Sequence, residues 1–294
     1  MMIEEFLNYL QYERNRSDLT VRSYGRSLKD FEAYFKNRDS QLSWESVDSD
    51  LIRDWMESMM DKGDMASTVN SCLSAVRSFF RFALSRNLVS HDPAHNVKGP
   101  KKQKPLPQFV REDEMDRLID RPEYWNDSYR DLRARTIIIM FYETGMRLAE
   151  LIGLDDADVD MDARQLKVTG KRNKQRIIPF GEELSQVLKA YVERRNQEAL
   201  RKEAALFVND KGCRMTRNQV ESIVHHYLSL TTTLKKRSPH VLRHSFATAM
   251  LNHGAGLESV RKLLGHESVA TTEIYTHTTF EQLKRVYENA HPRA

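Results

Sequence analysis

Apolar residues recur at intervals of three and four along the first third of the chain, which is the period of an amphipathic helix. Phe6, Leu7 and Leu10 begin this pattern, and Leu28 and Phe31 continue it. The pattern predicts four helices, over residues 2–14, 18–37, 47–62 and 66–86. Candidate N-caps precede the last three: Ser17 or Asp18, Ser46 or Asp48, and Ser67 or Thr68. Residues 1–97 are therefore expected to form a small helical bundle.

The helical pattern stops before residue 108. The stretch from residue 97 to 107 reads Val-Lys-Gly-Pro-Lys-Lys-Gln-Lys-Pro-Leu-Pro, with three prolines, one glycine and four lysines. Proline lacks the backbone N–H that a regular element requires, and the lysines keep the segment in solvent. We expect a basic linker over residues 98–107.

Helical periodicity returns in residues 108–294 and is interrupted once. Helices are expected over 111–120, 129–145, 182–203, 216–229, 239–252, 256–264, 269–276 and 279–289. Leu-Lys-Val-Thr and Arg-Ile-Ile-Pro-Phe flank a Gly/Asn turn between residues 165 and 180, which predicts a β-hairpin. The expected fold is mainly α, with a helical N-terminal bundle and a second domain that holds a small β-hairpin.

Composition changes this picture little. With 294 residues and 40% hydrophobic content, the chain can bury a core in each of two domains. The longest apolar run, Ile137 to Tyr142, is far short of a membrane span, and the acidic N-terminus has no signal region. We therefore expect a cytoplasmic protein. Cys72 and Cys213 fall in different domains and match no metal-ligand spacing, so both are expected to be reduced.

Positive charge is concentrated locally. The net charge is only +4, but residues 164–176 hold six lysines and arginines with no acidic residue between them. A second basic cluster, Lys-Lys-Arg, occupies residues 235–237. Each cluster alone is as compatible with a solvated surface as with a polyanion partner.

Three short motifs carry side chains suited to chemistry. In Thr-Gly-Met-Arg-Leu-Ala-Glu-Leu (144–151), Arg147 and Glu150 are three apart and share a helix face. Taken alone, this pair is best interpreted as a surface ion pair.

The second motif, Ser-Pro-His-Val-Leu-Arg-His (238–244), begins a helix with a serine N-cap and a proline at the first position. His240 and Arg243 would project from its first turns. A helix N-terminus with these side chains favours an anion such as phosphate. We interpret His244 as a core residue that faces away from Arg243.

The third motif comprises Leu-Leu-Gly-His-Glu-Ser (263–268) and Thr-Thr-Glu-Ile-Tyr-Thr-His (271–277). His266 follows the glycine that ends one helix, and Tyr275 lies nine residues further on. On its own, Tyr275 would more often be an ordinary half-buried tyrosine than a nucleophile.

Together with Gly-Lys-Arg-Asn-Lys-Gln-Arg (170–176), these motifs resemble, in order and spacing, those of the tyrosine recombinases. These are site-specific DNA strand-exchange enzymes. The resemblance covers nearly the whole chain and is strongest to the Xer recombinases, which resolve chromosome dimers.

The resemblance implies a role for each matching position. The catalytic set that it implies is Arg147, Lys171, His240, Arg243, His266 and Tyr275. The two arginines would bind the phosphate, with Glu150 as a supporting residue and the two histidines as their partners. Lys171 would be the general acid and Tyr275 the nucleophile. Lys174 lies close enough in the turn to compete for the acid role. The DNA contacts that we expect come from Arg172, Arg176, Lys101, Lys102 and Lys104.

This residue set suits phosphoryl transfer without a cofactor. A tyrosine phenol has a pKa near 10, so it attacks phosphorus only if a neighbour takes its proton and cations stabilise the growing charge. The leaving 5′ oxygen needs a proton in turn, which a lysine can donate. Exchange of a phosphodiester for a 3′-phosphotyrosyl ester requires no ATP, and the chain has neither a Walker A motif nor a carboxylate set for a metal.

The resemblance also implies an assembly. Two domains would clamp duplex DNA that carries two inverted half-sites, and four protomers, identical or paired with a related recombinase, would join two such sites. The terminal helix, 279–294, would pack into the neighbouring protomer, and a DNA translocase is a further candidate partner.

Alternatives remain open at this point. They are a mobile-element integrase of the same family, a type IB topoisomerase with the same chemistry, and a DNA-binding regulator without catalysis. The length of the chain, without an extra arm-binding domain, favours dimer resolution over integration.

Overall fold

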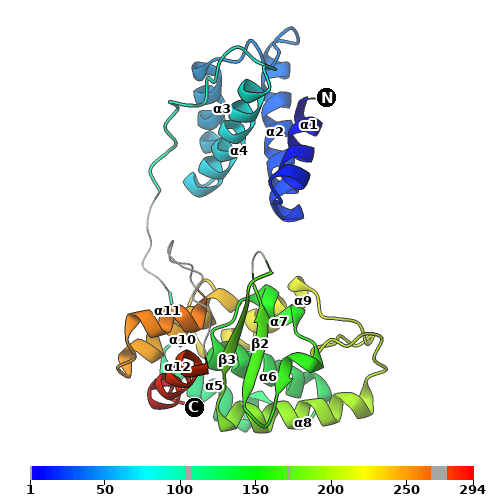
Figure 1. The fold of residues 1–294 in the computed structure, drawn as a ribbon, viewed down its shortest axis with the longest axis vertical. Coiled ribbons are helices and arrows are strands. Elements are labelled where there is room, and N and C mark those ends of the chain that lie inside the picture. Colours follow the sequence, from blue (N-terminus) through cyan, green and yellow to red (C-terminus); the bar gives the residue numbers. More distant parts are fainter. Residues whose placement is uncertain (1, 103–107, 171–172, 266–276) are drawn as a thin grey trace. The chain divides into compact units, whose positions relative to one another are not determined.

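A computed structural model of the chain describes residues 2–102, 108–170, 173–265 and 277–294, with side chains omitted at 277–279. The chain forms two compact units, Met1–Pro105 and Leu106–Ala294, each with its own hydrophobic core (Figure 1). None of the helices in the described ranges has the length and apolar content that crossing a membrane would need.

The first unit is the expected helical bundle. Its elements are α1 (Met2–Asn8), the π-helical turn η1 (Tyr9–Glu13), α2 (Asp18–Arg38), α3 (Ser49–Asp61) and α4 (Ala66–Ser85). Ser17 and Asp48 cap α2 and α3 by accepting backbone N–H groups. The predicted cap of α4 is wrong, because α4 begins after Met65, which offers no side-chain acceptor, and Ser67 and Thr68 lie in the first turn.

Aromatic side chains fill the core of this unit. Phe31, Phe35 and Phe79 are fully buried around Trp44, whose ring centroid lies 4.3 Å from that of Phe79. Such ring contacts add to the burial of apolar area that holds the bundle together. The three- and four-residue spacing in the sequence thus corresponds to the faces that meet in this core.

The start of the expected linker is fixed to α4. The Asn70 side-chain amide donates to the Pro100 carbonyl at 2.8 Å, and Arg77 donates to the Val97 carbonyl. Lys101 and Lys102 follow and are exposed, whereas Lys104 lies outside the described residues. The segment 98–100 therefore belongs to the first unit rather than to a free linker.

The second unit is built around α6 (Tyr129–Thr144), which is buried from Thr136 to its end. The helices α5 (Glu112–Asp120), α8 (Glu182–Glu198), α9 (Arg217–Thr231) and α10 (Pro239–Asn252) complete this core. Of these, α8, α9 and α10 pack directly on α6. Short 3₁₀ turns, η2 (Pro122–Tyr124) and η3 (Asp156–Asp158), connect the elements. Helix α8 ends five residues earlier than expected, and the chain after it bonds to the turn at Gly212.

A small antiparallel sheet contains the predicted hairpin. Strands β2 (Gln165–Thr169) and β3 (Gln175–Pro179) pair with Val168 opposite Arg176, and β1 (Val159–Asp160) adds a third strand that was not predicted. Leu166 and Val168 are buried while their neighbours are not, as the period of two requires. In Figure 1 the sheet lies beside α7 (Leu148–Gly153) and α6.

The last helices form a smaller cluster. Phe246 of α10 and Leu263 of α11 (Leu257–Leu264) pack with Leu283 and Tyr287 of α12 (His277–Ala290). The helix expected over 279–289 is confirmed and begins two residues earlier. The helix expected over 269–276 falls outside the described residues.

Candidate active site

The site begins where α6 ends. Gly145 takes a left-handed conformation, with φ +58°, and a Cβ there would lie 2.4 Å from the Phe246 ring. Only glycine satisfies both conditions. This turn directs the Gly145 carbonyl toward α10 and brings Arg147 to the start of α7.

Arg147 and Glu150 form more than a surface ion pair. Arg147 is the N-cap residue of α7, and its backbone N–H donates to Glu150 Oε2 at 2.7 Å. Its guanidinium Nη1 donates to Glu150 Oε1 at 2.9 Å. The Glu150 side chain is 2% exposed, whereas that of Arg147 is 43% exposed. Arg147 Nη2 also donates to the Gly265 carbonyl at 2.9 Å. The buried carboxylate and this carbonyl therefore orient an arginine whose exposed side chain keeps further N–H groups for a ligand.

Arg176 shares the same carboxylate, and the structure places it inside the protein, although we expected it at the DNA-binding surface. Its Nη1 and Nη2 atoms donate to Glu150 Oε1 and Oε2 at 2.6 and 2.9 Å. The Arg176 side chain is 7% exposed, because β3 turns it inward. Burial raises the pKa of Glu150, but the hydrogen bonds and charges of Arg176 and Arg147 outweigh burial and leave it below its usual value.

Arg243 is the second buried arginine and lies on α10. Its Nη1 donates to the Gly145 carbonyl and its Nη2 to the Leu264 carbonyl, both at 2.7 Å. Burial, with the charges of Arg147 and Arg176, lowers the pKa of Arg243 to about 9, which leaves it cationic at neutral pH. A cation that burial and like charges destabilise gains most from a nearby anion.

These side chains make an electropositive cluster. Three guanidinium groups, those of Arg147, Arg176 and Arg243, surround one carboxylate, so the formal balance is two positive charges. Arg147 is the member with the most exposed side chain. Guanidinium forks match the oxygens of a phosphate group, so phosphate is the ligand that this cluster suits.

His240 lies one turn before Arg243 and is exposed. Its Nε2 atom is 3.1 Å from Nε2 of His244, with the rings nearly perpendicular. Burial, followed by the charges of His244, Lys236 and Arg243, lowers the pKa of His240. The interpretation of His244 as a core residue is wrong, because its side chain is only half-buried and shares a helix face with His240, four residues away.

Ser238 precedes α10 with Pro239 at the first position, as expected, but its hydroxyl does not cap the helix. The backbone N–H groups of the first turn of α10 therefore receive no cap from the Ser238 side chain.

Besides Lys104, four predicted site residues of the second unit lie outside the described residues: Lys171, Arg172, His266 and Tyr275. Their described neighbours border the cluster. A Cβ on Gly170 would lie 3.3 Å from Glu150 Oε1, and one on Gly265 would lie 3.0 Å from the Arg176 side chain. Lys174 is exposed, and its carbonyl accepts the Gly170 N–H at 2.7 Å.

Tyr287, which lies twelve residues after Tyr275, is unsuited to attack. It is 1% exposed and its hydroxyl donates to Glu143 Oε2 at 3.1 Å. Burial and the charge of Glu143 raise its pKa well above the usual value, opposite to what a nucleophile needs. In this single chain α12 packs on its own unit.

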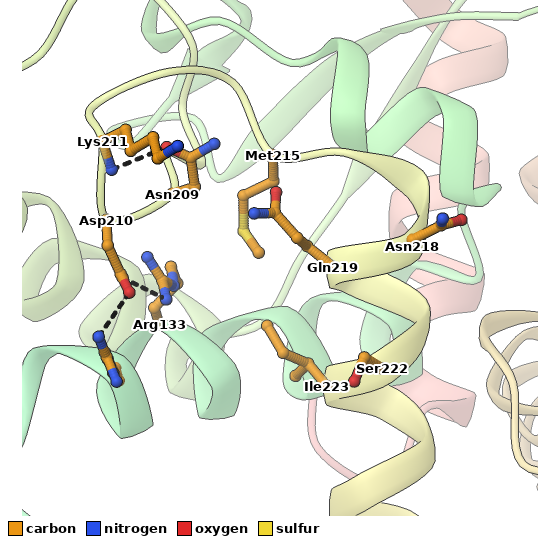
Figure 2. Close-up of a pocket in the computed structure, with 10 residues that line it drawn as sticks. Arg133, Asn209, Asp210, Lys211, Met215, Asn218, Gln219, Ser222 and Ile223 are labelled. Atoms are coloured by element: carbon orange, nitrogen blue, oxygen red, sulfur yellow. Dashed lines mark hydrogen bonds and ion pairs between the residues drawn. The ribbon is translucent and has the colours of Figure 1, made fainter.

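A surface hollow of about 640 Å³ lies elsewhere on the second unit (Figure 2). Arg133, Asp210 and Lys211 line one side of it, and Asn218 and Gln219 of α9 line the other. Arg133 Nη2 donates to Asp210 Oδ1 at 3.1 Å, so part of its positive charge is already compensated. None of the predicted site residues lines this hollow. Across the described ranges, no cluster of three or more His, Cys, Asp or Glu residues could hold a metal ion.

Both units match known families. Residues 108–282 match the phage integrase family, and residues 3–87 match the phage integrase N-terminal SAM-like domain. The arginine cluster therefore lies within the part that matches the phage integrase family.

Two bacterial relatives match along nearly their full length. The chain is 35% identical to a tyrosine recombinase XerD of Oceanobacillus iheyensis, covering 99% of this chain and 98% of the relative. It is 37% identical to a tyrosine recombinase XerC of Chlorobaculum parvum, covering 99% and 94%.

Two solved structures are also similar. One is the XerA recombinase, with 26% identity, a TM-score of 0.51, and coverage of 100% of this chain and 99% of that one. The other is the XerH site-specific recombinase bound to a palindromic difH substrate in a post-cleavage complex. It has a TM-score of 0.73 at 23% identity and covers 96% of this chain and 83% of that one, which shows a shared fold.

Proposed function

The chain belongs to the phage integrase family and is a tyrosine-type site-specific DNA recombinase, and we propose that it cleaves each DNA strand with Tyr275 as the nucleophile. The observation that carries this proposal is the cluster of Arg147, Arg176 and Arg243 around the Glu150 carboxylate. The described residue Gly265 borders that cluster, ten residues before Tyr275.

In this mechanism Arg147 and Arg243 bind the non-bridging oxygens of the scissile phosphate. Their bonds to Glu150 and to backbone carbonyls hold each guanidinium in a set orientation before DNA arrives. Attack on phosphorus adds negative charge to those oxygens, so the same contacts strengthen in the transition state. The cluster therefore supports catalysis as well as binding.

Proton transfer completes the reaction. His240 is the described candidate to accept the Tyr275 proton, since burial and nearby positive charge lower its pKa and so favour the neutral form that can accept a proton. His266 is the second histidine of the proposed set. Lys171 donates a proton to the leaving 5′ oxygen, with Lys174 as the competing candidate. The product is a 3′-phosphotyrosyl ester, whose energy is similar to that of the phosphodiester it replaces. Attack by another 5′ hydroxyl then rejoins the strands.

The partners of the chain follow from the family. We propose that it binds duplex DNA with two inverted half-sites, as a tetramer of one recombinase or of two related ones. The resemblance to Xer recombinases favours dimer resolution over mobile-element integration, with a DNA translocase as a candidate activator. Because the relatives are bacterial proteins, the compartment that we propose is the cytoplasm, where bacterial DNA lies.

Covalent trapping tests the proposal. A nicked duplex that carries the recombination site, recovered from genomic fragments that the protein binds, should form a protease-sensitive covalent adduct in the presence of EDTA. A DNA-binding regulator would shift the same duplex without any adduct. A type IB topoisomerase would relax supercoiled plasmids that lack the site, which we expect this protein not to do.

A further inference from the structure

Arg176 is the one basic residue of the β2–β3 hairpin that is buried, among the hairpin residues that the structure describes. Its strand neighbours Gln175 and Ile177 are exposed, so the alternation of β3 turns only Arg176 toward the interior at this end. Its guanidinium is 7% exposed and donates three hydrogen bonds within the protein. An arginine held in this way has little left to offer a DNA phosphate.

The first partner of Arg176 also holds Arg147. The Glu150 carboxylate accepts both terminal nitrogens of Arg176, at 2.6 and 2.9 Å. The same two oxygens accept the backbone N–H and Nη1 of Arg147, at 2.7 and 2.9 Å. The bidentate fork of Arg176 therefore fixes the plane of the carboxylate to which Arg147 donates its hydrogen bonds.

The second partner of Arg176 is the C-terminal end of α11. Three successive carbonyls there each accept a hydrogen bond from a different arginine. Arg176 Nε donates to Leu263 at 3.1 Å, Arg243 Nη2 to Leu264 at 2.7 Å, and Arg147 Nη2 to Gly265 at 2.9 Å. The partial negative charge at a helix C-terminus favours such cations.

These contacts separate the three arginines by task. Arg147 is 43% exposed at its side chain, and Arg243 binds only backbone carbonyls, so both can turn free N–H groups toward a ligand. Arg176 is bonded to the same two supports as Arg147, the carboxylate and the helix end, but its own side chain is buried. A substitution there disturbs the two supports of Arg147 at once.

We propose that Arg176 is a positioning residue for strand cleavage, which fixes the Glu150 carboxylate and the end of α11 and so orients Arg147. This inference rests on the recombinase function proposed above. It predicts that the loss of Arg176 slows the chemical step and leaves affinity for DNA nearly unchanged.

The test uses the full chain and compares Arg176→Gln, Arg176→Lys, Glu150→Gln and the double variant Glu150→Gln/Arg176→Gln. Two quantities are measured on the nicked site duplex: the single-turnover cleavage rate at saturating protein, and the dissociation constant as a function of salt. Far-ultraviolet circular dichroism establishes that each variant is folded. Arg176→Lys keeps a buried cation, so it supplies a folded variant even if Arg176→Gln is unstable.

We expect Arg176→Gln to cleave about tenfold to a hundredfold more slowly, the range that a small displacement of a catalytic group produces. Its dissociation constant and salt slope should match the wild-type values within about threefold. Arg176→Lys should also be slow, because lysine lacks the fork that grips both carboxylate oxygens. The double variant should be no slower than the slower single variant, since both act on one contact.

Lys167→Gln provides the matched control, because Lys167 lies on the adjacent strand with a 52% exposed side chain. It should cleave at the wild-type rate at saturation. The inference is overturned if Arg176→Gln and Arg176→Lys cleave at the wild-type rate. It is also overturned if Arg176→Gln lowers the salt slope by about one phosphate, or if the effects of the Glu150 and Arg176 substitutions multiply. A wild-type chain that forms no adduct would instead refute the recombinase function itself.

Discussion

Lys171, the proposed general acid, and Arg243, a proposed phosphate ligand, can be distinguished by changing the leaving group of the DNA substrate. Lys171→Ala should cleave an ordinary substrate very slowly, because the 5′ alkoxide leaves without a proton donor. A substrate with a bridging 5′ sulfur has a leaving group that needs no proton, so it should restore cleavage by Lys171→Ala. It should not restore Arg243→Ala, in which a contact to the developing charge, typically worth about 3 kcal/mol, is lost.

Lys174→Ala is the control for this prediction, since Lys174 is exposed in the same turn. Rescue of Lys174→Ala in place of Lys171→Ala would transfer the acid role to Lys174. Lack of rescue for both would exclude a lysine of this turn as the acid.

The sequence indicates the burial and the contacts of some site residues better than those of others. The motif around Arg147 and Glu150 indicated a shared face, which the structure has. Arg176 was grouped with its exposed basic neighbours. Alternation along a short strand separates two faces, but only the packing of the sheet determines which face is buried. His244 was misplaced because it was interpreted relative to Arg243, whereas its four-residue spacing from His240 puts both histidines on one side of the helix.

At the scale of elements, α12 is held by a buried acid at the end of α6. Glu143 is fully buried, and its Oε2 accepts the Gly181 N–H at 3.0 Å and the Tyr287 hydroxyl at 3.1 Å. Burial raises the pKa of Glu143 to about 8. The carboxyl group is therefore protonated in the folded chain at neutral pH, although it would be ionised in the unfolded chain.

This difference predicts how stability depends on pH. Between the unfolded pKa near 4.5 and the folded pKa of about 8, only the folded chain keeps this proton. The contribution of Glu143 to the free energy of unfolding should thus fall as pH rises, by on the order of 1 kcal/mol per pH unit. Glu143→Gln has no such proton, so the unfolding free energy of wild type relative to this variant should decline from pH 5 to pH 8.

Chemical denaturation of both proteins at several pH values measures the decline. Glu182→Gln, whose side chain is 51% exposed on α8, should show no comparable trend. A difference between wild type and Glu143→Gln that stays constant with pH would mean that Glu143 is ionised in the folded protein.

The elements themselves were largely predictable, because long amphipathic periods and the Gly/Asn turn are local signals. Strand β1 has only two residues and forms through pairing with β2, so no local pattern indicates it. Nor does a local pattern indicate the π-helical turn after α1 or the early end of α8. The apolar residues of α12, among them Leu283 and Tyr287, recur at helical spacing, but periodicity alone does not say what covers them. In the single chain, α10 and α11 cover them, and the transfer of α12 to a neighbouring protomer stays a prediction.

At the scale of the whole molecule, each unit has its own core, so the second unit should fold alone. The fragment 108–294 should retain covalent adduct formation, because the arginine cluster and Tyr275 all lie within it. It should bind the site much more weakly than the full chain. The fragment lacks the phosphate contacts that we expect from the first unit and from Lys101 and Lys102. Its slope of log affinity against log salt concentration should therefore be flatter than that of the full chain.

Binding isotherms of the fragment and the full chain at several salt concentrations test this division. Equal affinity with equal slope would mean that the first unit makes no DNA contact. Loss of adduct formation in a folded fragment would place part of the chemistry in the first unit.

The central claim is that Tyr275 becomes linked to DNA, and mapping the linkage tests it most directly. The adduct formed with a nicked site duplex is digested with nuclease and trypsin, and the peptide that carries the nucleotide remnant is identified by mass spectrometry. Trypsin should release residues 263–284 as one peptide, in which Tyr275 is the single tyrosine, whereas Tyr287 falls in the separate peptide 286–293. We predict that the remnant lies on Tyr275 and that Tyr275→Phe forms no adduct while still binding the site. A remnant on any other residue, or an adduct with Tyr275→Phe at the wild-type rate, would contradict the account.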